Sequence, residues 1–226
     1  MNYFDWKQLF NPEFYILLEF SGIKIGLIVV LFIVFAETGL LAGFFLPGDS
    51  LLFLAGIYSE TLMQQISVGN SFLNVSLLAT LVSLMGILGN MVGYWFGEKS
   101  GTYLYNRKDN FLFKKKYLFQ SKAFFEKYGA KAIVFARFLP LFRTFAPVIA
   151  GIVSMDKKRF MFFNILGSFL WSFTMIFSGH YLYQLFLEEF HIDLKHYIEY
   201  IVIVIIIITT FPVLIKLLKK SVHLED

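Results

Sequence analysis

The chain has no cysteine and few charged residues, and both absences narrow what it can be. Without cysteine it can form neither disulfides nor thiolate metal sites. Charged residues make up only 16% of the 226 residues and hydrophobic residues 58%, which excludes an ordinary soluble domain. Residues 61–97 contain no Lys, Arg, Asp or Glu, and neither do residues 160–187. Uncharged runs of this length predict a polytopic membrane protein with a single domain over residues 1–226.

The N-terminal residues 1–22 lack the basic start of a cleavable signal peptide. They mix aromatic residues with a few charges, which predicts an interfacial amphipathic helix. Three apolar runs further along the chain are each long enough to cross a bilayer. They predict membrane spans at residues 72–97, 160–187 and 197–216.

Two other apolar segments, residues 24–59 and 130–154, are interrupted by glycine or proline. A straight helix over the first would be too long for one span, which needs about 20 residues. We therefore expect each segment to form a re-entrant helical hairpin, covered by protein where its backbone is irregular. The residues expected to break the helices are Pro47, Gly48, Pro140 and Pro147.

The two hairpin segments repeat each other and carry opposite charges. Glu37 precedes Pro47 by ten residues, and Arg137 precedes Pro147 by ten residues. The span after each hairpin then contains an Asn-x-x-Gly motif, which predicts packing and hydrogen bonding between helices. These motifs are Asn90 to Gly93 and Asn164 to Gly167. Charges inside an apolar segment are costly and mark a site or pathway, here an acid in one hairpin and a base in the other.

Basic residues are concentrated in a segment at residues 98–130. Counted through Lys131, it holds nine basic and three acidic residues. By the positive-inside rule, this segment, the cluster at 157–159 and the lysines at 216–220 lie in the cytoplasm, with the C-terminus. The two hairpins then enter the membrane from opposite faces, as an inverted repeat. Aromatic residues between the basic ones leave a nucleic-acid partner open, but attraction to anionic lipid headgroups is the simpler account, so no nucleic acid is expected.

Three motifs resemble the DedA family, also called the VTT or SNARE-associated domain family. They are F-L-P-G-D at 45–49, G-x-x-x-G-Y-W at 89–95 and F-x-R-F-x-P-x-x-R-T-x-x-P-x-x-A-G at 135–151. The resemblance implies an all-α polytopic membrane fold, with two inverted re-entrant hairpins packed against about three transmembrane helices. It also implies a protein of the bacterial inner membrane that moves phosphate-bearing lipids, such as undecaprenyl phosphate or a phospholipid, between leaflets. In some members this movement is linked to the proton gradient.

The chemistry of the charged residues suits such a substrate. The guanidinium fork binds phosphate through paired hydrogen bonds, so Arg137 and Arg143 are expected to hold the lipid phosphate, helped by the Thr144 hydroxyl. Glu37 and Asp49 are expected to balance the arginines and to carry protons. Two structural roles stay open beside this one: ion pairs that join the hairpins, and Asp49 as a helix N-cap.

Nothing in the motifs predicts an enzyme, a metal site or a cofactor. The four histidines lie outside the motifs, and His180 stands alone in a span with no Asp, Glu or Cys beside it in sequence. No nucleophile and base accompany the charged residues, which argues against catalysis. The alternative function is a proton-coupled transporter of a small solute or ion, or a membrane protein of osmotic stress. A homo-oligomer is left open.

Overall fold

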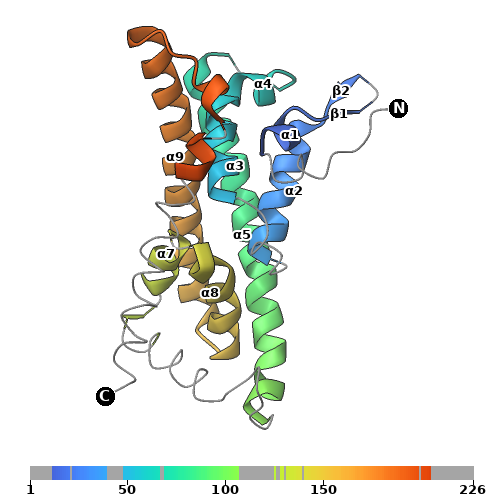
Figure 1. Ribbon diagram of the computed structural model, residues 1–226. Helices are drawn as coiled ribbons and strands as arrows, with labels where there is room; N and C mark the ends of the chain where they lie inside the picture. The colour runs from blue at the N-terminus through green and yellow to red at the C-terminus, as the bar shows by residue number, and fades with distance from the viewer. Residues whose placement is uncertain are drawn as a thin grey trace, which may run out of the picture. The chain divides into compact units, whose positions relative to one another are not determined.

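Helices make up most of the computed structural model of this chain, in agreement with the predicted helical class (Figure 1). The structure describes residues 12–20, 22–39, 48–66, 69–106, 125, 128–129, 131–138, 140–198 and 200–204. For residues 102–106 and 140–141 only the backbone is described. The expected break at Pro47, most of the basic segment, and the lysines at 216–220 lie outside the described residues, as does the last span beyond Val204.

Within the described ranges, two helices are long and apolar enough to cross a membrane. Helix α5 spans Ser71–Asn106 and α9 spans Lys157–Glu189, with 36 and 33 residues. At 1.5 Å per residue they are roughly 50 Å long, more than the hydrocarbon core of a bilayer. They cover the spans predicted at 72–97 and 160–187, and α5 continues into the basic segment. Charged residues mark where a helix leaves the lipid, but they do not end the helix, because Lys and Glu are good helix formers.

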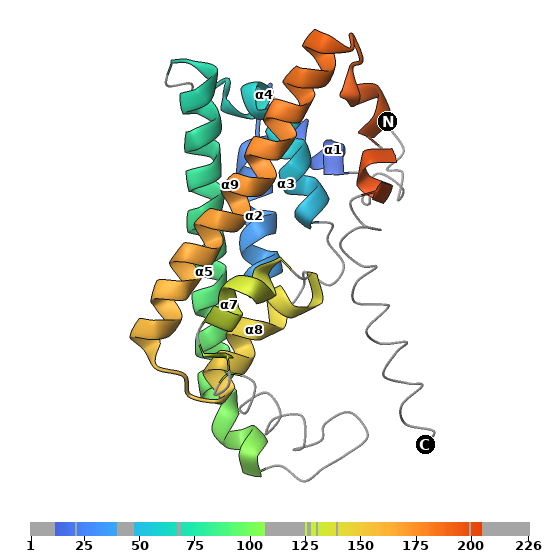
Figure 2. The ribbon, with the colours of Figure 1, turned by 90° about the vertical axis from the view of Figure 1, so that its left-hand side faces the viewer.

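The two segments expected to be hairpins each form a pair of short helices. The first pair is α2, Gly26–Gly39, and α3, Gly48–Ile57; the second is α7, Lys131–Arg137, and α8, Pro140–Ile152. Each of these helices has 14 residues or fewer, too short to cross a bilayer alone. Helices α7 and α8 lie side by side in both views (Figures 1 and 2).

Two predictions about breaks have different outcomes. Pro140 opens α8, where its missing N–H would have had no partner in the helix anyway. The prediction that Pro147 breaks a helix is wrong, because α8 runs through it to Ile152. Loss of one backbone hydrogen bond is tolerated there, since this stretch of α8 is held by side-chain packing: Pro147 and Val148 pack against Gly93 of α5.

The N-terminal region differs from the predicted amphipathic helix. Among the described residues of this region, which begin at Pro12, Pro12–Ile16 forms a helix, α1, which leads into two antiparallel strands, β1 at Glu19–Phe20 and β2 at Ile23–Lys24. Gly22 has a φ of +80°, a left-handed conformation that favours a turn over a helix. The remaining elements are the short helix α4, Ser59–Met63, and the 3-10 helix η3, Leu194–Tyr197.

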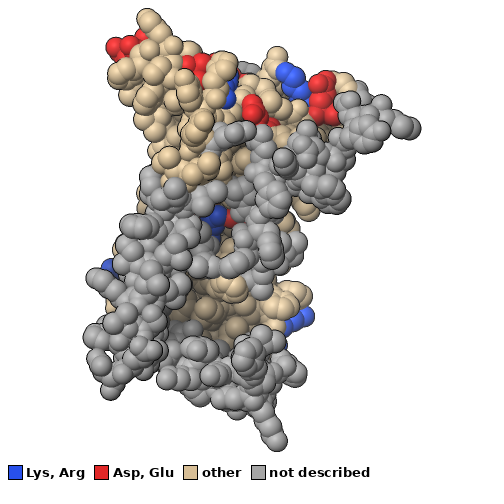
Figure 3. All heavy atoms as spheres, viewed as in Figure 1, with Lys and Arg blue, Asp and Glu red and all other residues tan. Residues whose placement is uncertain are grey.

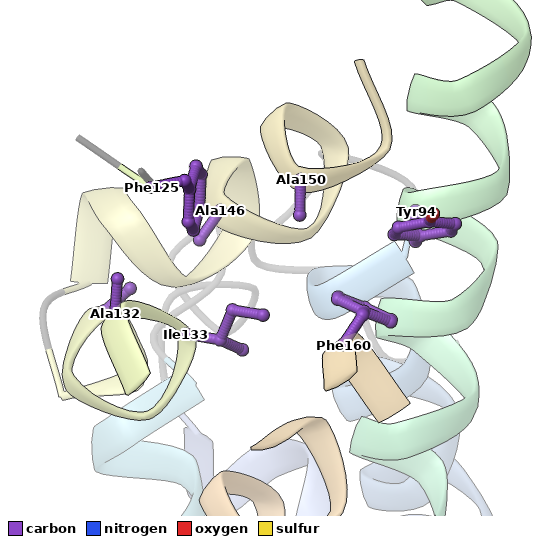
Figure 4. Packing of buried hydrophobic residues seen from close by; sticks show 8 residues of the cluster. Tyr94, Phe125, Ala132, Ile133, Ala146, Ala150 and Phe160 are labelled. Carbon is purple, nitrogen blue, oxygen red and sulfur yellow. The ribbon is translucent and has the colours of Figure 1, made fainter. Parts of the chain in front are cut away.

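The chain forms two compact units, and each is described by itself. Unit 1 comprises residues 1–30, 47–78 and 174–226; unit 2 comprises residues 31–46 and 79–173. Unit 2 has a core of small and aromatic side chains from α5, α7, α8 and α9 (Figure 4). In it the rings of Tyr94 and Phe160 stack with centroids 4.4 Å apart, and the Tyr94 hydroxyl donates to the carbonyl of Met155 at 2.6 Å.

Glycines on α5 let other helices of unit 2 approach its backbone. A Cβ at Gly89 would overlap the Thr38 hydroxyl and lie 2.8 Å from the carbonyl oxygen of Phe35, both on α2. A Cβ at Gly97 would overlap the carbonyl of Val148 on α8. This stripe of small residues brings the end of α2 and the length of α8 against one face of α5. Charged side chains carried by these elements are therefore held close to that face.

Candidate functional site

The two arginines predicted to bind phosphate lie on either side of the break between α7 and α8. Arg137 is the last residue of α7, and Arg143 lies in the first turn of α8. Their side chains are only 3% and 5% exposed. Burial of this degree is rare for arginine and normally requires a paired anion, so the partners of each guanidinium decide what the site can do.

Arg143 has a buried anionic partner. Its Nη2 donates to Oε1 of Glu37 near the end of α2, and the Glu37 side chain is fully buried. Near the middle of the view in Figure 3, blue atoms of Lys or Arg lie beside red atoms of Asp or Glu. The ten-residue repeat predicted an acid and a base at matching positions, and the structure brings Glu37 to Arg143.

Arg137 has no ion pair within the described residues. Its Nη1 lies 3.4 Å from Oδ1 of Asn164 on α9, at the long end of a hydrogen bond. Its Nε and Nη2 atoms are buried and have no hydrogen-bond partner among the residues that the structure describes. These two atoms form one edge of the guanidinium, the edge that binds an oxyanion side-on through two parallel hydrogen bonds. The structure therefore presents a buried, unused pair of donors.

Trp171 of α9 holds both guanidiniums against one ring. The central carbons of Arg137 and Arg143 lie 5.2 Å and 5.1 Å from the ring centroid, and the indole is fully buried. Cation–π contacts of this kind stabilise a desolvated guanidinium by roughly 2 kcal/mol. Within the described part of unit 2, the buried charges are these two cations and the Glu37 carboxylate, so the cluster carries a net positive charge.

The two Asn-x-x-Gly motifs meet at this cluster. Nδ2 of Asn90 on α5 donates to Oδ1 of Asn164 at 2.7 Å, and Nδ2 of Asn164 donates to the carbonyl of Ile87 at 3.2 Å. Asn164 therefore ties α5 to α9 while its oxygen also faces Arg137. Gly86 makes room for the arginine, because a Cβ there would overlap Nη2.

The remaining predicted site residues are Thr144, Gly48 and Asp49. Thr144 is buried directly after Arg143 on α8. Gly48 opens α3 in unit 1, with Asp49 beside it in the first turn, where the helix dipole favours a carboxylate. Asp49 is buried within this unit and lies inside the helix rather than at the cap position.

Sequence reasoning missed the role of Trp171. The signal was available in the spacing: Asn164, Ser168 and Trp171 fall at i, i+4 and i+7, on one face of α9. The role of Gly86 was likewise missed, since nothing in the sequence says that an arginine would lie against it.

A helical membrane protein with a buried ionic cluster is the class that the fold and this site define, and comparison with known proteins specifies the family. Residues 46–181 match the model of the VTT domain. Protein DedA of Escherichia coli is 32% identical over 193 residues, which cover 85% of this chain and 82% of the relative. An uncharacterized membrane protein of Mycobacterium tuberculosis is 37% identical over 187 residues, 83% of this chain and 76% of the relative.

Inner membrane protein YqjA of Escherichia coli is 31% identical over 182 residues, covering 79% of this chain and 73% of the relative. No solved structure matches the chain. The chain belongs to the VTT-domain family of membrane proteins, to which DedA gives its other name.

Proposed function

We propose that this protein is a lipid translocase that moves a phosphate-bearing lipid, such as undecaprenyl phosphate or a phospholipid, between membrane leaflets. Arg137 binds the phosphate, and Arg143 and Thr144 complete the headgroup site. Unlike an enzyme, the protein leaves the lipid chemically unchanged. The single observation that carries this proposal is the buried Nε–Nη2 edge of Arg137, which has no hydrogen-bond partner in the described part of the chain.

Charge balance supports an anionic ligand. Glu37 pairs with Arg143, so a ligand phosphate would offset the charge of Arg137. A buried unpaired cation is expensive, and a structure that keeps one desolvated gains most when an anion arrives. Trp171 holds the guanidinium in place in the absence of ligand, so little side-chain entropy is lost on binding.

Apolar side chains beside the arginines support a lipid over a water-soluble anion. Phe135 is 71% exposed on α7, next to the turn that carries Arg137. Phe142 and Phe145 are exposed on α8, on either side of Arg143 and Thr144. In a membrane these rings face hydrocarbon, so a lipid tail can stay in the bilayer while its phosphate enters the site.

Protonation of the acids is the proposed link to an energy source. When Glu37 is ionised it competes with a phosphate for Arg143, and when it is protonated it releases that arginine for the ligand. Asp49 is proposed as a second carrier. Glu37→Gln should therefore remove the dependence of transfer on pH between 6 and 8, whereas unchanged pH dependence would take Glu37 out of the coupling.

The proposed setting is the inner membrane, with two re-entrant hairpins entering from opposite faces and a cytoplasmic C-terminus. Because the chain has no cysteine, single cysteines report topology directly. Cysteines at Lys115 and Lys219 should be protected from an impermeant thiol reagent in intact cells, and one at Gln65 should react. Labelling of Lys115 from outside would overturn the orientation.

The function is tested by reconstitution into vesicles with a fluorescent phosphate-bearing lipid. Arg137→Ala should reduce transfer to the rate of protein-free vesicles, and Arg137→Lys should stay impaired because an ammonium cannot form the bidentate contact. Arg159→Ala, which removes an exposed guanidinium from the start of α9, is the matched control and should transfer normally. Uptake of inorganic phosphate without lipid transfer would favour the alternative, a small-ion transporter.

A further inference from the structure

A second buried polar cluster lies in unit 1 and shares no residue with the arginine site. His180 of α9 is 4% exposed. Its Nδ1 lies 2.9 Å from Oγ of Ser59 on α4, and its Nε2 lies 3.1 Å from Oγ of Ser71, the first residue of α5. One imidazole thus joins three helices through two hydroxyl groups.

The charged and titratable groups around this imidazole are few. Helix α4 contributes Glu60, an exposed carboxylate whose Oε2 accepts from Nδ2 of Asn74 on α5 at 3.3 Å. Helix α9 itself contributes Tyr181, whose ring centroid is 5.2 Å from that of His180. Helix α3 contributes the uncharged backbone of Gly56, packed against the backbone of Ile176 and His180. Glu60 favours a cationic imidazole, and the N-terminus of α5 opposes it.

The two serines fit every protonation state of the ring. A hydroxyl can donate or accept, so both ring nitrogens keep a partner in either neutral tautomer. When the imidazole is protonated, both hydroxyls rotate and accept from the two N–H groups. A serine rather than a carboxylate faces Nδ1, so the arrangement lacks the acid that orients a catalytic histidine. The geometry serves reversible protonation better than nucleophilic attack.

We propose that His180 is a proton-binding site that exchanges with water at the start of α5. Ser71 is partly exposed, and its Oγ lies 3.1 Å from Nε2 of the ring. A proton from hydronium adds to the Ser71 oxygen as that hydroxyl gives its own proton to the Nε2 lone pair; water is left behind and the ring becomes an imidazolium. Binding of the proton adds one positive charge where α4, α5 and α9 meet at His180.

The test is a histidine NMR titration of the full chain in nanodiscs. The variant with His191, His196 and His223 all replaced by Gln leaves His180 as the sole imidazole, so its ¹⁵N signals are assigned without a His180 mutant. We expect both nitrogens to convert from the neutral to the protonated form as the pH falls from 8 to 4.5.

Two variants separate proton binding from a structural role. Ser71→Ala removes an acceptor from the imidazolium and should move the midpoint about one pH unit lower. Glu60→Gln should move it less, in the same direction, because its carboxylate is exposed and screened. Ser76→Ala, one turn further along α5, is the control and should leave the midpoint unchanged. A ring that stays in one neutral tautomer down to pH 4.5, or a midpoint indifferent to both variants, would overturn the proposal.

Discussion

The buried polar clusters around His180 and around Arg137 differ in whether their polar atoms have hydrogen-bond partners. In unit 1, both ring nitrogens of His180 have a hydroxyl partner. In unit 2, two of the three guanidinium nitrogens of Arg137 have no partner within the described residues, although the side chain is just as deeply buried. A satisfied cluster is complete without a ligand, whereas an unsatisfied one keeps its desolvation penalty until something supplies the missing acceptors. The difference supports the proposal that an external anion binds at the arginine cluster.

Arg143→Ala should have the largest effect on stability. The substitution removes the cation from the fully buried Glu37 carboxylate, and breaking a buried pair in this way costs about 3–5 kcal/mol. Equilibrium unfolding in mixed micelles measures the change in the free energy of unfolding. The double variant Arg143→Ala with Glu37→Ala should recover part of the loss. A single variant as stable as wild type would mean that the pair is not formed in the membrane.

Ser59→Ala should have the next largest effect, and it tests the satisfied cluster. Loss of the hydroxyl leaves Nδ1 of His180 buried with one hydrogen bond fewer, at a cost of about 1–3 kcal/mol. Ser76→Ala, on the more open part of α5, provides the baseline for a serine-to-alanine change. If both variants have the same free energy of unfolding, the hydrogen bond between Ser59 and His180 contributes no more to stability than the Ser76 hydroxyl does.

Gly89→Ala tests whether close approach of α2 to α5 holds the arginine cluster together. The added methyl group would overlap the Thr38 hydroxyl, so α2 must shift and carry Glu37 away from Arg143. Overpacking of this kind costs about 1–3 kcal/mol, partly offset by the better helix propensity of alanine. Thermal melts of Gly89→Ala and of Leu88→Ala, on the exposed face of α5, give the comparison. An unchanged melting temperature for Gly89→Ala would show that the helices are further apart.

Arg137→Ala should have the smallest effect on stability. It is also the most direct check that the polar atoms of Arg137, unlike those of His180, are not needed for folding. Since Arg137 has no ion pair among the described residues, removing it relieves a buried charge, which offsets the lost contacts with Asn164 and Trp171. The free energy of unfolding should stay within about 1 kcal/mol of wild type. A loss as large as that of Arg143→Ala would indicate that Arg137 is a structural cation.

The sequence was sufficient to predict the helical class, the two long helices and the charged residues of the cluster. The repeat of Glu37 and Arg137 about two prolines predicted an acid and a base at matching positions, because both charges interrupt otherwise apolar segments. Which arginine meets Glu37 could not be predicted, because that depends on how α7 and α8 pack on α5. The structure pairs Glu37 with Arg143.

Other features depend on residues far apart in the chain. Ser59 and Ser71 lie 121 and 109 positions from His180, so the histidine looked isolated in sequence. Pro147 looked like a helix break, but packing against Gly93 carries α8 past it. Local propensity predicts where a helix can end, and tertiary contacts decide whether it does.

Direct binding of a lipid phosphate is the most direct test of the account. Purified protein is titrated with dodecyl phosphate and the bound fraction is read by native mass spectrometry, for wild type, Arg137→Ala and Arg159→Ala. Two charge-assisted hydrogen bonds predict an affinity at least about 100-fold weaker for Arg137→Ala, with Arg159→Ala equal to wild type. Equal affinity of Arg137→Ala and wild type would contradict the claim that the unused edge of Arg137 is the phosphate site.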